Sequence, residues 1–139
     1  MNSYNGFSPS HRYKALAWFK KEIKEGRKPA KPDICDACGQ KDGVLAWHSE
    51  DYSEPFGNHI GEHGLCYLCH MMIHCRFKNK ATWSKYVDII ESGMVAEPFH
   101  FNDFKTFAND FLNKKMVSVE FKATGFNGSK LLSKIGGIV

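Results

Sequence analysis

The sequence predicts an α+β domain in which a short strand and a helix are clamped together by a zinc ion. Two Cys-x-x-Cys motifs, Cys35–Cys38 and Cys66–Cys69, suit one tetrahedral zinc site. Between them lies an apolar run that ends at His48, which is typical of a strand. Apolar residues at helical spacing begin at the second motif and recur in both flanks of the chain.

Length and composition favour a single globular domain without a membrane span. With 139 residues, 42% of them hydrophobic, the chain suits one globular domain over residues 1–139. There is no apolar run long enough to span a membrane, and residues 1–10 lack the pattern of a signal peptide. We therefore expect no membrane partner and a cytoplasmic location, in a bacterial host cell or a phage-infected cell. In a reducing compartment, paired cysteines indicate a metal site rather than disulfides.

Residues 8–26 are predicted to form an N-terminal helix. Ser8 offers a capping hydroxyl, the proline that follows suits a first helical turn, and Gly26 suits the position after the last turn. Apolar residues at positions 16, 19 and 23 form one face, and lysines dominate the other. The formal net charge of +4 is modest, so the lysines are either phosphate contacts or an ordinary solvated surface.

Residues 33–78 are predicted to be the zinc-stapled core. Four thiolates leave no open position on a zinc ion, so a site made by Cys35, Cys38, Cys66 and Cys69 would be structural. A redox role for the Cys-x-x-Cys motifs is the alternative. The core is predicted to run from a strand over 44–48, through a loop over 51–64 that has room for a second strand, to a helix over 65–77.

Three histidines outside the cysteine motifs suggest a second site. His70 and His74 are four residues apart, so on a helix they share one face and can hold one divalent cation. His48, at the end of the predicted strand, would be brought near them by the zinc clamp. A neutral imidazole can accept a proton from water, and a cation can stabilise charge on a phosphate. Together these groups suit phosphodiester hydrolysis.

The motif region resembles the HNH endonucleases of the ββα-metal superfamily, in particular the zinc-knuckle type of phages and bacteria. The resemblance covers residues 33–77 and rests on the two cysteine pairs, the segment His48-Ser49-Glu50-Asp51-Tyr52-Ser53-x-Pro55, and the run Cys69-His70-x-x-Ile73-His74. It implies a ββα-metal core and a metal-dependent endonuclease that nicks DNA or, as a homodimer, cuts both strands. It also implies that His48 is the general base and that His70 and His74 are ligands of a catalytic cation. This cation would be Mg²⁺, Mn²⁺ or another divalent ion, in addition to the structural Zn²⁺.

The chain departs from that family at the end of the strand, where relatives carry two adjacent polar residues, a ligand and then a base. If the pair is Trp47-His48, the base is kept and a ligand is lost. If the pair is His48-Ser49, His48 is the ligand and serine stands in the position of the base. Serine is a poor base at neutral pH, so the sequence favours the first alignment. In the first case Glu50 or Asp51 would supply the missing carboxylate, and we take Asp51 as the candidate ligand.

The nucleic-acid contacts are predicted from charge and position. Arg76 and Lys78 follow the predicted helix and are candidate phosphate contacts, and Asn58 is a candidate for the middle asparagine of the motif, with His59 and His63 as competitors. A zinc-stabilised nucleic-acid-binding module without catalysis is the alternative function.

Residues 81–139 are predicted to be a helical and mixed extension. Expected elements are a helix over 82–92 that ends before Gly93, a second helix over about 102–115 with a stripe of phenylalanines, and a strand over 117–121. Residues 125–139 are expected to be a loosely held tail.

Overall fold

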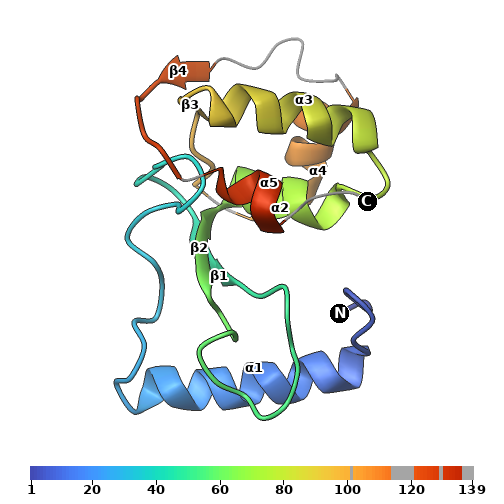
Figure 1. Ribbon diagram of the computed structural model, residues 1–139, viewed down its shortest axis with the longest axis vertical. Helices are drawn as coiled ribbons and strands as arrows, with labels where there is room; N and C mark the ends of the chain where they lie inside the picture. Colours follow the sequence, from blue (N-terminus) through green and yellow to red (C-terminus); the bar gives the residue numbers. More distant parts are fainter. Residues whose placement is uncertain (101, 114–120, 129, 136–139) are drawn as a thin grey trace.

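The computed structural model describes residues 1–100, 102–113, 121–128 and 130–135 (Figure 1). The protein is an α+β chain whose central feature is a β-hairpin packed on a helix. The elements in chain order are α1 (Pro9–Lys24), β1 (Leu45–His48), β2 (His63–Cys66), α2 (Tyr67–Cys75), α3 (Lys80–Glu91), β3 (Met94–Ala96), α4 (Phe104–Phe107), the π-helical turn η1 (Ala108–Asn113), β4 (Phe121–Ala123) and α5 (Leu131–Ile135).

The N-terminal helix α1 begins where the sequence predicts. The Ser8 side chain accepts a hydrogen bond from the backbone N–H of His11 at 3.1 Å, which satisfies one of the unpaired donors of the first turn. Gly26 follows the end of α1 with a φ of +81°, a conformation that suits glycine. Ala15 and Phe19 are buried on the inner face of the helix.

The predicted core is present as a ββα unit. Strands β1 and β2 pair antiparallel with Leu45 opposite Cys66 and His48 opposite His63, and α2 follows β2 directly. Helix α2 starts at Tyr67, two residues later than predicted, because Cys66 is its N-cap and its Sγ accepts from the Cys69 N–H at 3.5 Å. The second strand, for which the sequence left room in a loop, is therefore β2 and carries the first cysteine of the second motif.

The first cysteine motif is docked onto β2 by backbone contacts. Asp36 N–H donates to the Gly64 carbonyl at 2.8 Å, and Gly64 N–H donates to the Asp36 carboxylate at 2.8 Å. A Cβ at Gly64 would lie 2.4 Å from Cβ of Pro32, so only glycine allows the linker to approach the strand this closely. These contacts bring the two cysteine motifs together.

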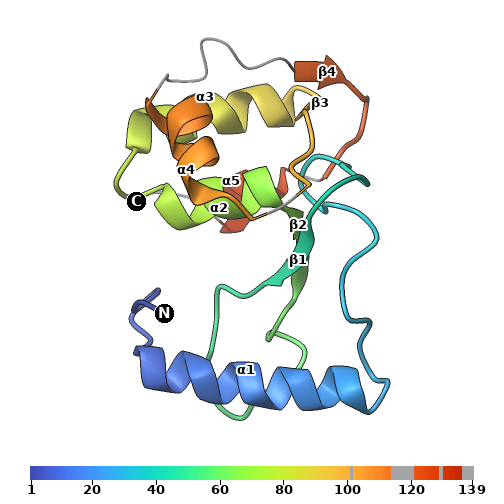
Figure 2. The same cartoon turned by 180° about the vertical axis from the view of Figure 1, so that it is seen from behind.

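The elements form two groups joined by the hairpin. Helix α1 lies at one end of the molecule, α2 to α5 lie at the other, and the hairpin extends between them in both views (Figures 1 and 2). The larger apolar cluster surrounds the cysteines and α3, with Leu65, Ile73 and Tyr86 fully buried. A smaller cluster of Ala15, Phe19 and Ile60 fixes α1 against the loop after β1.

Helices α2 and α3 confirm most of the predicted buried positions, with one exception. Leu68 and Met72 of α2 are buried, as are Trp83, Tyr86, Val87 and Ile90 of α3. Phe77, predicted to face the core, is 51% exposed because α2 ends at Cys75 and the chain turns before α3. The guanidinium of Arg76 covers its ring, with Cζ 4.3 Å from the ring centroid.

The C-terminal extension differs more from the predictions. Asp103 caps α4 by accepting from Thr106 N–H at 3.0 Å, but α4 ends at Phe107 and continues as the turn η1. Phe107 and Phe111 are buried as predicted, whereas Phe104 is 55% exposed. The expected strand falls partly outside the described residues, and β4 over Phe121–Ala123 pairs with β3, which was not predicted.

The expectation of a loose tail is wrong for residues 131–135. They form α5, and Leu132 is buried in the main apolar cluster with 1% of its surface exposed. None of the helices in the described part of the chain is long and apolar enough to cross a membrane.

Candidate metal centres

Four cysteines form a buried cluster at the base of the hairpin. The Sγ atoms of Cys35, Cys38, Cys66 and Cys69 all lie within 4.8 Å of one another, and Cys38 Sγ lies 3.7 Å from Cys66 Sγ. None of the four is more than 6% exposed. This arrangement fits a structural zinc ion, as the spacing of the motifs predicts.

The electrostatics of the cluster favour a bound cation. Hydrogen bonding with Cys35 and Cys38 raises the pKa of Cys66, and burial raises the pKa of Cys69. Four crowded thiols in an apolar core cannot all lose their protons unless a positive charge compensates them. A zinc ion would supply that charge, and thiols that bind it would be deprotonated outright.

Helix α3 contributes to the surroundings of the cysteines. The Tyr86 hydroxyl, carried on this helix and fully buried, lies 3.0 Å from Cys69 Sγ. Such an outer contact orients a metal ligand and satisfies the hydroxyl inside the core. The cysteine cluster thereby links the hairpin, α2 and α3.

Three histidines form a second cluster where β1 meets α2. His48 ends β1, and His70 and His74 lie one turn apart on the same face of α2. Each offers a ring nitrogen, and these nitrogens lie within 4.8 Å of one another. The ring of His48 lies 5.0 Å from that of His70 and 5.1 Å from that of His74, centroid to centroid. The structure therefore brings together the three histidines that the sequence singles out.

The two helical histidines are poised as neutral ligands. Their Nε2 atoms lie 3.0 Å apart, close to the ~3–3.4 Å expected for two nitrogens each about 2.1 Å from one ion. Burial, followed by the charges of neighbouring groups, lowers the pKa of His70 well below its ordinary value. Burial, then His48 and Arg12, lowers the pKa of His74 to about 4. Both imidazoles are therefore uncharged at neutral pH and keep a lone pair for a cation.

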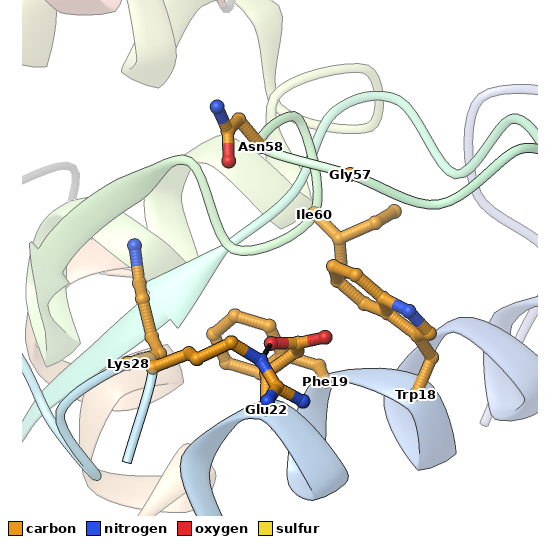
Figure 3. Close-up of a pocket in the computed structure, with 8 residues that line it drawn as sticks. Trp18, Phe19, Glu22, Lys28, Gly57, Asn58 and Ile60 are labelled. Atoms are coloured by element: carbon orange, nitrogen blue, oxygen red, sulfur yellow. Dashed lines mark hydrogen bonds and ion pairs between the residues drawn. The ribbon is translucent and has the colours of Figure 1, made fainter. Parts of the chain in front are cut away.

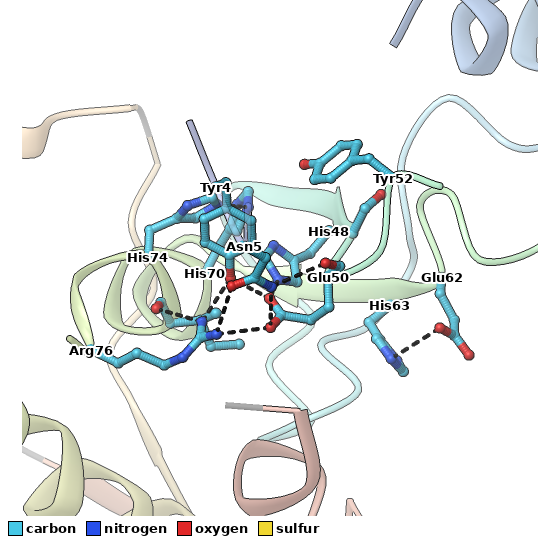
Figure 4. A network of polar contacts seen from close by, with 12 residues as sticks. Tyr4, Asn5, His48, Glu50, Tyr52, Glu62, His63, His70, His74 and Arg76 are labelled. Carbon is cyan, nitrogen blue, oxygen red and sulfur yellow. Dashed lines mark hydrogen bonds and ion pairs between the residues drawn. The ribbon is translucent and has the colours of Figure 1, made fainter. Parts of the chain in front are cut away.

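Glu50 is the carboxylate of the histidine cluster (Figure 4). Its Oε2 lies 2.5 Å from His48 Nε2, and its Oε1 accepts from Arg76 Nη2 at 2.9 Å. Tyr4 and Asn5 complete its surroundings: the phenol of Tyr4 donates to Oε2, and the amide of Asn5 donates to Oε1 at 3.1 Å. Although partial burial alone would raise it, hydrogen bonds from His48 and Tyr4 lower the pKa of Glu50 to about 2.

This network fixes the proton on His48. Glu50 is a carboxylate at neutral pH and can only accept hydrogen bonds. The His48 nitrogen that faces it, Nε2, must therefore carry a proton and donate to Glu50. A carboxylate that holds a metal-binding histidine in one tautomer is the usual outer contact of such sites.

Arg76 lies inside the site and not on the surface. It is 3% exposed, donates to the Tyr4 hydroxyl at 2.7 Å and to the Ile73 carbonyl at 3.0 Å, and pairs with Glu50. Lys78, the other residue predicted to contact phosphate, is exposed just past α2. The sequence predicts both residues as phosphate contacts, but in the structure Arg76 is buried and Lys78 is exposed.

The remaining predicted residues lie apart from the histidines. Asp51 is exposed and accepts from Ser53 N–H at 2.8 Å, so it closes a turn. It does not join the histidines in the candidate ligand group found among the described residues.

Asn58 lines a cavity of about 400 Å³ against α1, with Trp18 and Lys28 (Figure 3). Ser49 is buried, and its hydroxyl accepts from Gly61 N–H at 2.6 Å.

Two residues of the site come from the N-terminal segment and were missed. The Tyr4 ring packs on His74 with centroids 4.7 Å apart and on His48 at 5.8 Å. Arg12 of α1 is buried, with Cζ 5.2 Å from the centroid of the Tyr4 ring and 5.0 Å from that of Tyr52. No local motif marks either residue, although a buried arginine in a chain with only three arginines is unusual.

Comparison with protein-family models, with curated proteins and with solved structures finds no match to this chain. What the structure supports is a ββα unit with a cysteine cluster suited to structural zinc and a histidine cluster that can bind a second metal ion.

Proposed function

We propose that this protein is a metal-dependent nuclease that hydrolyses phosphodiester bonds of DNA at the histidine cluster. One observation carries the proposal. The nitrogens of His48, His70 and His74 converge within 4.8 Å at the junction of a β-hairpin and a helix, beside a cysteine cluster that does not need them. The resemblance of residues 33–77 to HNH endonucleases supports the same assignment.

The ligand set favours a transition metal. Imidazoles suit Zn²⁺, Ni²⁺ and other transition-metal ions, whereas Mg²⁺ prefers oxygen ligands. The one nearby carboxylate, Glu50, already accepts hydrogen bonds from His48, Tyr4, Asn5 and Arg76. We therefore expect activity with Mn²⁺, Co²⁺, Ni²⁺ or Zn²⁺ in preference to Mg²⁺. Such an ion polarises a phosphate oxygen and makes water a stronger nucleophile.

We assign His48 the role of third ligand in preference to that of general base. Its Nε2 donates to Glu50, so only Nδ1 can offer a lone pair to an ion. With only 2% of its surface exposed, His48 has little access to an attacking water molecule. This assignment corresponds to the His48-Ser49 alignment. Ser49 does not replace the base, because its hydroxyl is buried and engaged by Gly61.

The charges around the site suit a polyanionic substrate. Lys78 is exposed one turn beyond His74, and the outer face of α1 carries exposed lysines at positions 14, 20, 21 and 24. Lysines of this kind neutralise phosphates without reading sequence. We propose DNA as the partner and Lys78 as a phosphate contact.

Cleavage of supercoiled plasmid with each divalent ion in turn tests the proposal. We expect nicking that falls by about 10²-fold or more in His70→Ala and His74→Ala, because the ion is lost. His63→Ala is the matched control, since His63 lies opposite His48 in the hairpin but outside the cluster. Equal nicking by all variants would exclude the histidine cluster as the active site.

His48→Ala separates the two roles of that residue. As a ligand, His48 is needed for binding of the second ion, so both ion binding and cleavage should fall. If His48 is the base, the variant keeps the ion and loses only cleavage.

A second candidate function is a zinc-stabilised nucleic-acid-binding module without catalysis. The observation that favours it is the buried Ser49, which leaves no second polar residue free at the end of β1. This alternative predicts that the wild type binds DNA yet cuts no DNA or RNA with any divalent ion.

A further inference from the structure

Arg12 is a buried cation without a counter-ion. The residue is 9% exposed, and its guanidinium donates to the Asn2 carbonyl at 2.5 Å and to the Tyr52 hydroxyl at 3.2 Å. Its Nε is buried with no hydrogen-bond partner, and no carboxylate pairs with it within the described residues. A charge removed from water in this way is costly unless an anion compensates it.

The other arginines of the chain each have carboxylate partners. Arg27 is exposed and pairs with Glu22 and Glu25, and Arg76 pairs with Glu50. Because Glu50 is the one carboxylate of the buried network, Arg12 and Arg76 together leave one positive charge in excess. The faces of Tyr4 and Tyr52 attract Arg12, but ring faces compensate only part of the cost of burying a charge.

The unpaired guanidinium lies beside the histidine cluster. The Tyr4 ring contacts both Arg12 and His74. An ion on the histidines would increase the positive charge of this region further.

We propose that Arg12 binds a phosphate group of the nucleic-acid substrate beside the histidine cluster. The choice of a strand phosphate rests on the proposed function. An arginine has five N–H donors in a planar fork that matches phosphate oxygens, and Arg12 uses two of its groups on neutral acceptors. The residue keeps 9% of its surface exposed.

Arginine NMR signals provide a direct test with inorganic phosphate as the probe. The chain has three arginines, so three side-chain Nε–H signals are expected, and Arg12→Lys identifies that of Arg12. At constant ionic strength, phosphate should shift the Arg12 signal and leave that of the paired, exposed Arg27 in place. An Arg12 signal that stays in place while phosphate replaces chloride would overturn the proposal.

The salt dependence of DNA binding tests the same contact on the intended substrate. Loss of one phosphate contact should reduce the slope of log K against log[salt] by about 0.9. We expect this change in Arg12→Gln and an unchanged slope in Arg27→Gln. Each variant must first show the same zinc content and the same unfolding midpoint as the wild type. An unchanged slope in a folded Arg12→Gln would contradict the proposal, and if that variant does not fold, the NMR titration decides.

These results are distinguishable from failure of the proposed function. A protein in which phosphate shifts the Arg12 signal but which cuts no nucleic acid has the anion site and lacks the nuclease activity. A protein that nicks plasmid through its histidines while Arg12 does not respond to phosphate or change the salt slope has the activity and lacks this site.

Discussion

Glu50 is the residue on which the geometry of the histidine cluster most depends. It joins His48 at the end of β1 to Arg76 after α2 and to Tyr4 in the N-terminal segment. Each of these contacts is stronger with a charged acceptor, so the network weakens as a unit when the charge is removed.

Glu50→Gln should lower the affinity of the histidine cluster for a divalent ion by about 10–100-fold, because an outer contact that orients a ligand is weakened. The change is measured by titrating Co²⁺ into protein whose cysteine site is filled with zinc. Glu62→Gln is the control, since Glu62 lies 3.7 Å from His63, a histidine outside the cluster. Equal Co²⁺ affinity in the two variants would show that Glu50 does not orient His48.

The ββα unit is the element that the sequence predicts best. Cysteine pairs specify a metal site through chemistry and spacing alone, and the apolar run before His48 and the helical spacing after Cys66 are local signals. The contacts that complete the histidine site are not local. Tyr4 meets Glu50 across 46 positions and Arg76 across 72, so neither could be read from a motif.

Elements stabilised mainly by tertiary contacts were also poorly predicted. β3 and β4 are three residues each, and α5 is five residues long, too short for a clear periodic pattern. Phe77 was placed in the core because it continues the apolar spacing of α2, but the helix ends before reaching it. Periodicity identifies a face and does not give the end of a helix.

Loss of the zinc should unfold the ββα unit. Apparent zinc binding of roughly 10–16 kcal/mol in small zinc peptides is comparable to the ~5–15 kcal/mol total stability of a domain. Cys38→Ser should therefore lose zinc and cooperative thermal unfolding together. Cys75→Ser is the matched control, because Cys75 is half-buried outside the cluster. A zinc-free Cys38→Ser protein that still unfolds cooperatively would refute the structural role of the site.

At the scale of the whole molecule, the buried histidines couple stability to pH. The pKa of His74 is lowered to about 4 and that of His70 is lowered as well, so between pH 6.5 and 4 the unfolded chain binds protons that the folded chain does not. The stability is complete above the unfolded value of about 6.5 and is lost as the pH falls. The lowered pKa of Glu50 acts in a separate window, below about 4.5.

Urea unfolding at pH 7 and pH 5.5, with zinc on the cysteines and no second ion, measures this coupling. His70 and His74 should each cost on the order of 1 kcal/mol at the lower pH. A His70→Asn/His74→Asn double variant should lose most of the difference between the two conditions. If the free energy of unfolding changes equally with pH in the wild type and the variant, the pH dependence arises from other residues.

The distribution of positive charge on the molecule favours the proposed partner, DNA. Two of its three arginines are buried around the histidines, and lysines line the exposed face of α1. Net charge alone is too small to predict nucleic-acid binding, and it is the concentration of cations near one candidate metal centre that favours it.

Native mass spectrometry of the zinc-loaded protein titrated with Co²⁺ tests the central claim most directly, since it counts ions bound to each chain. We predict one zinc and one further ion in the wild type and in His63→Ala, and one zinc alone in His74→Ala. A wild-type chain that never takes up a second ion, or a His74→Ala chain that still does, would contradict the assignment of the histidine cluster as a metal centre.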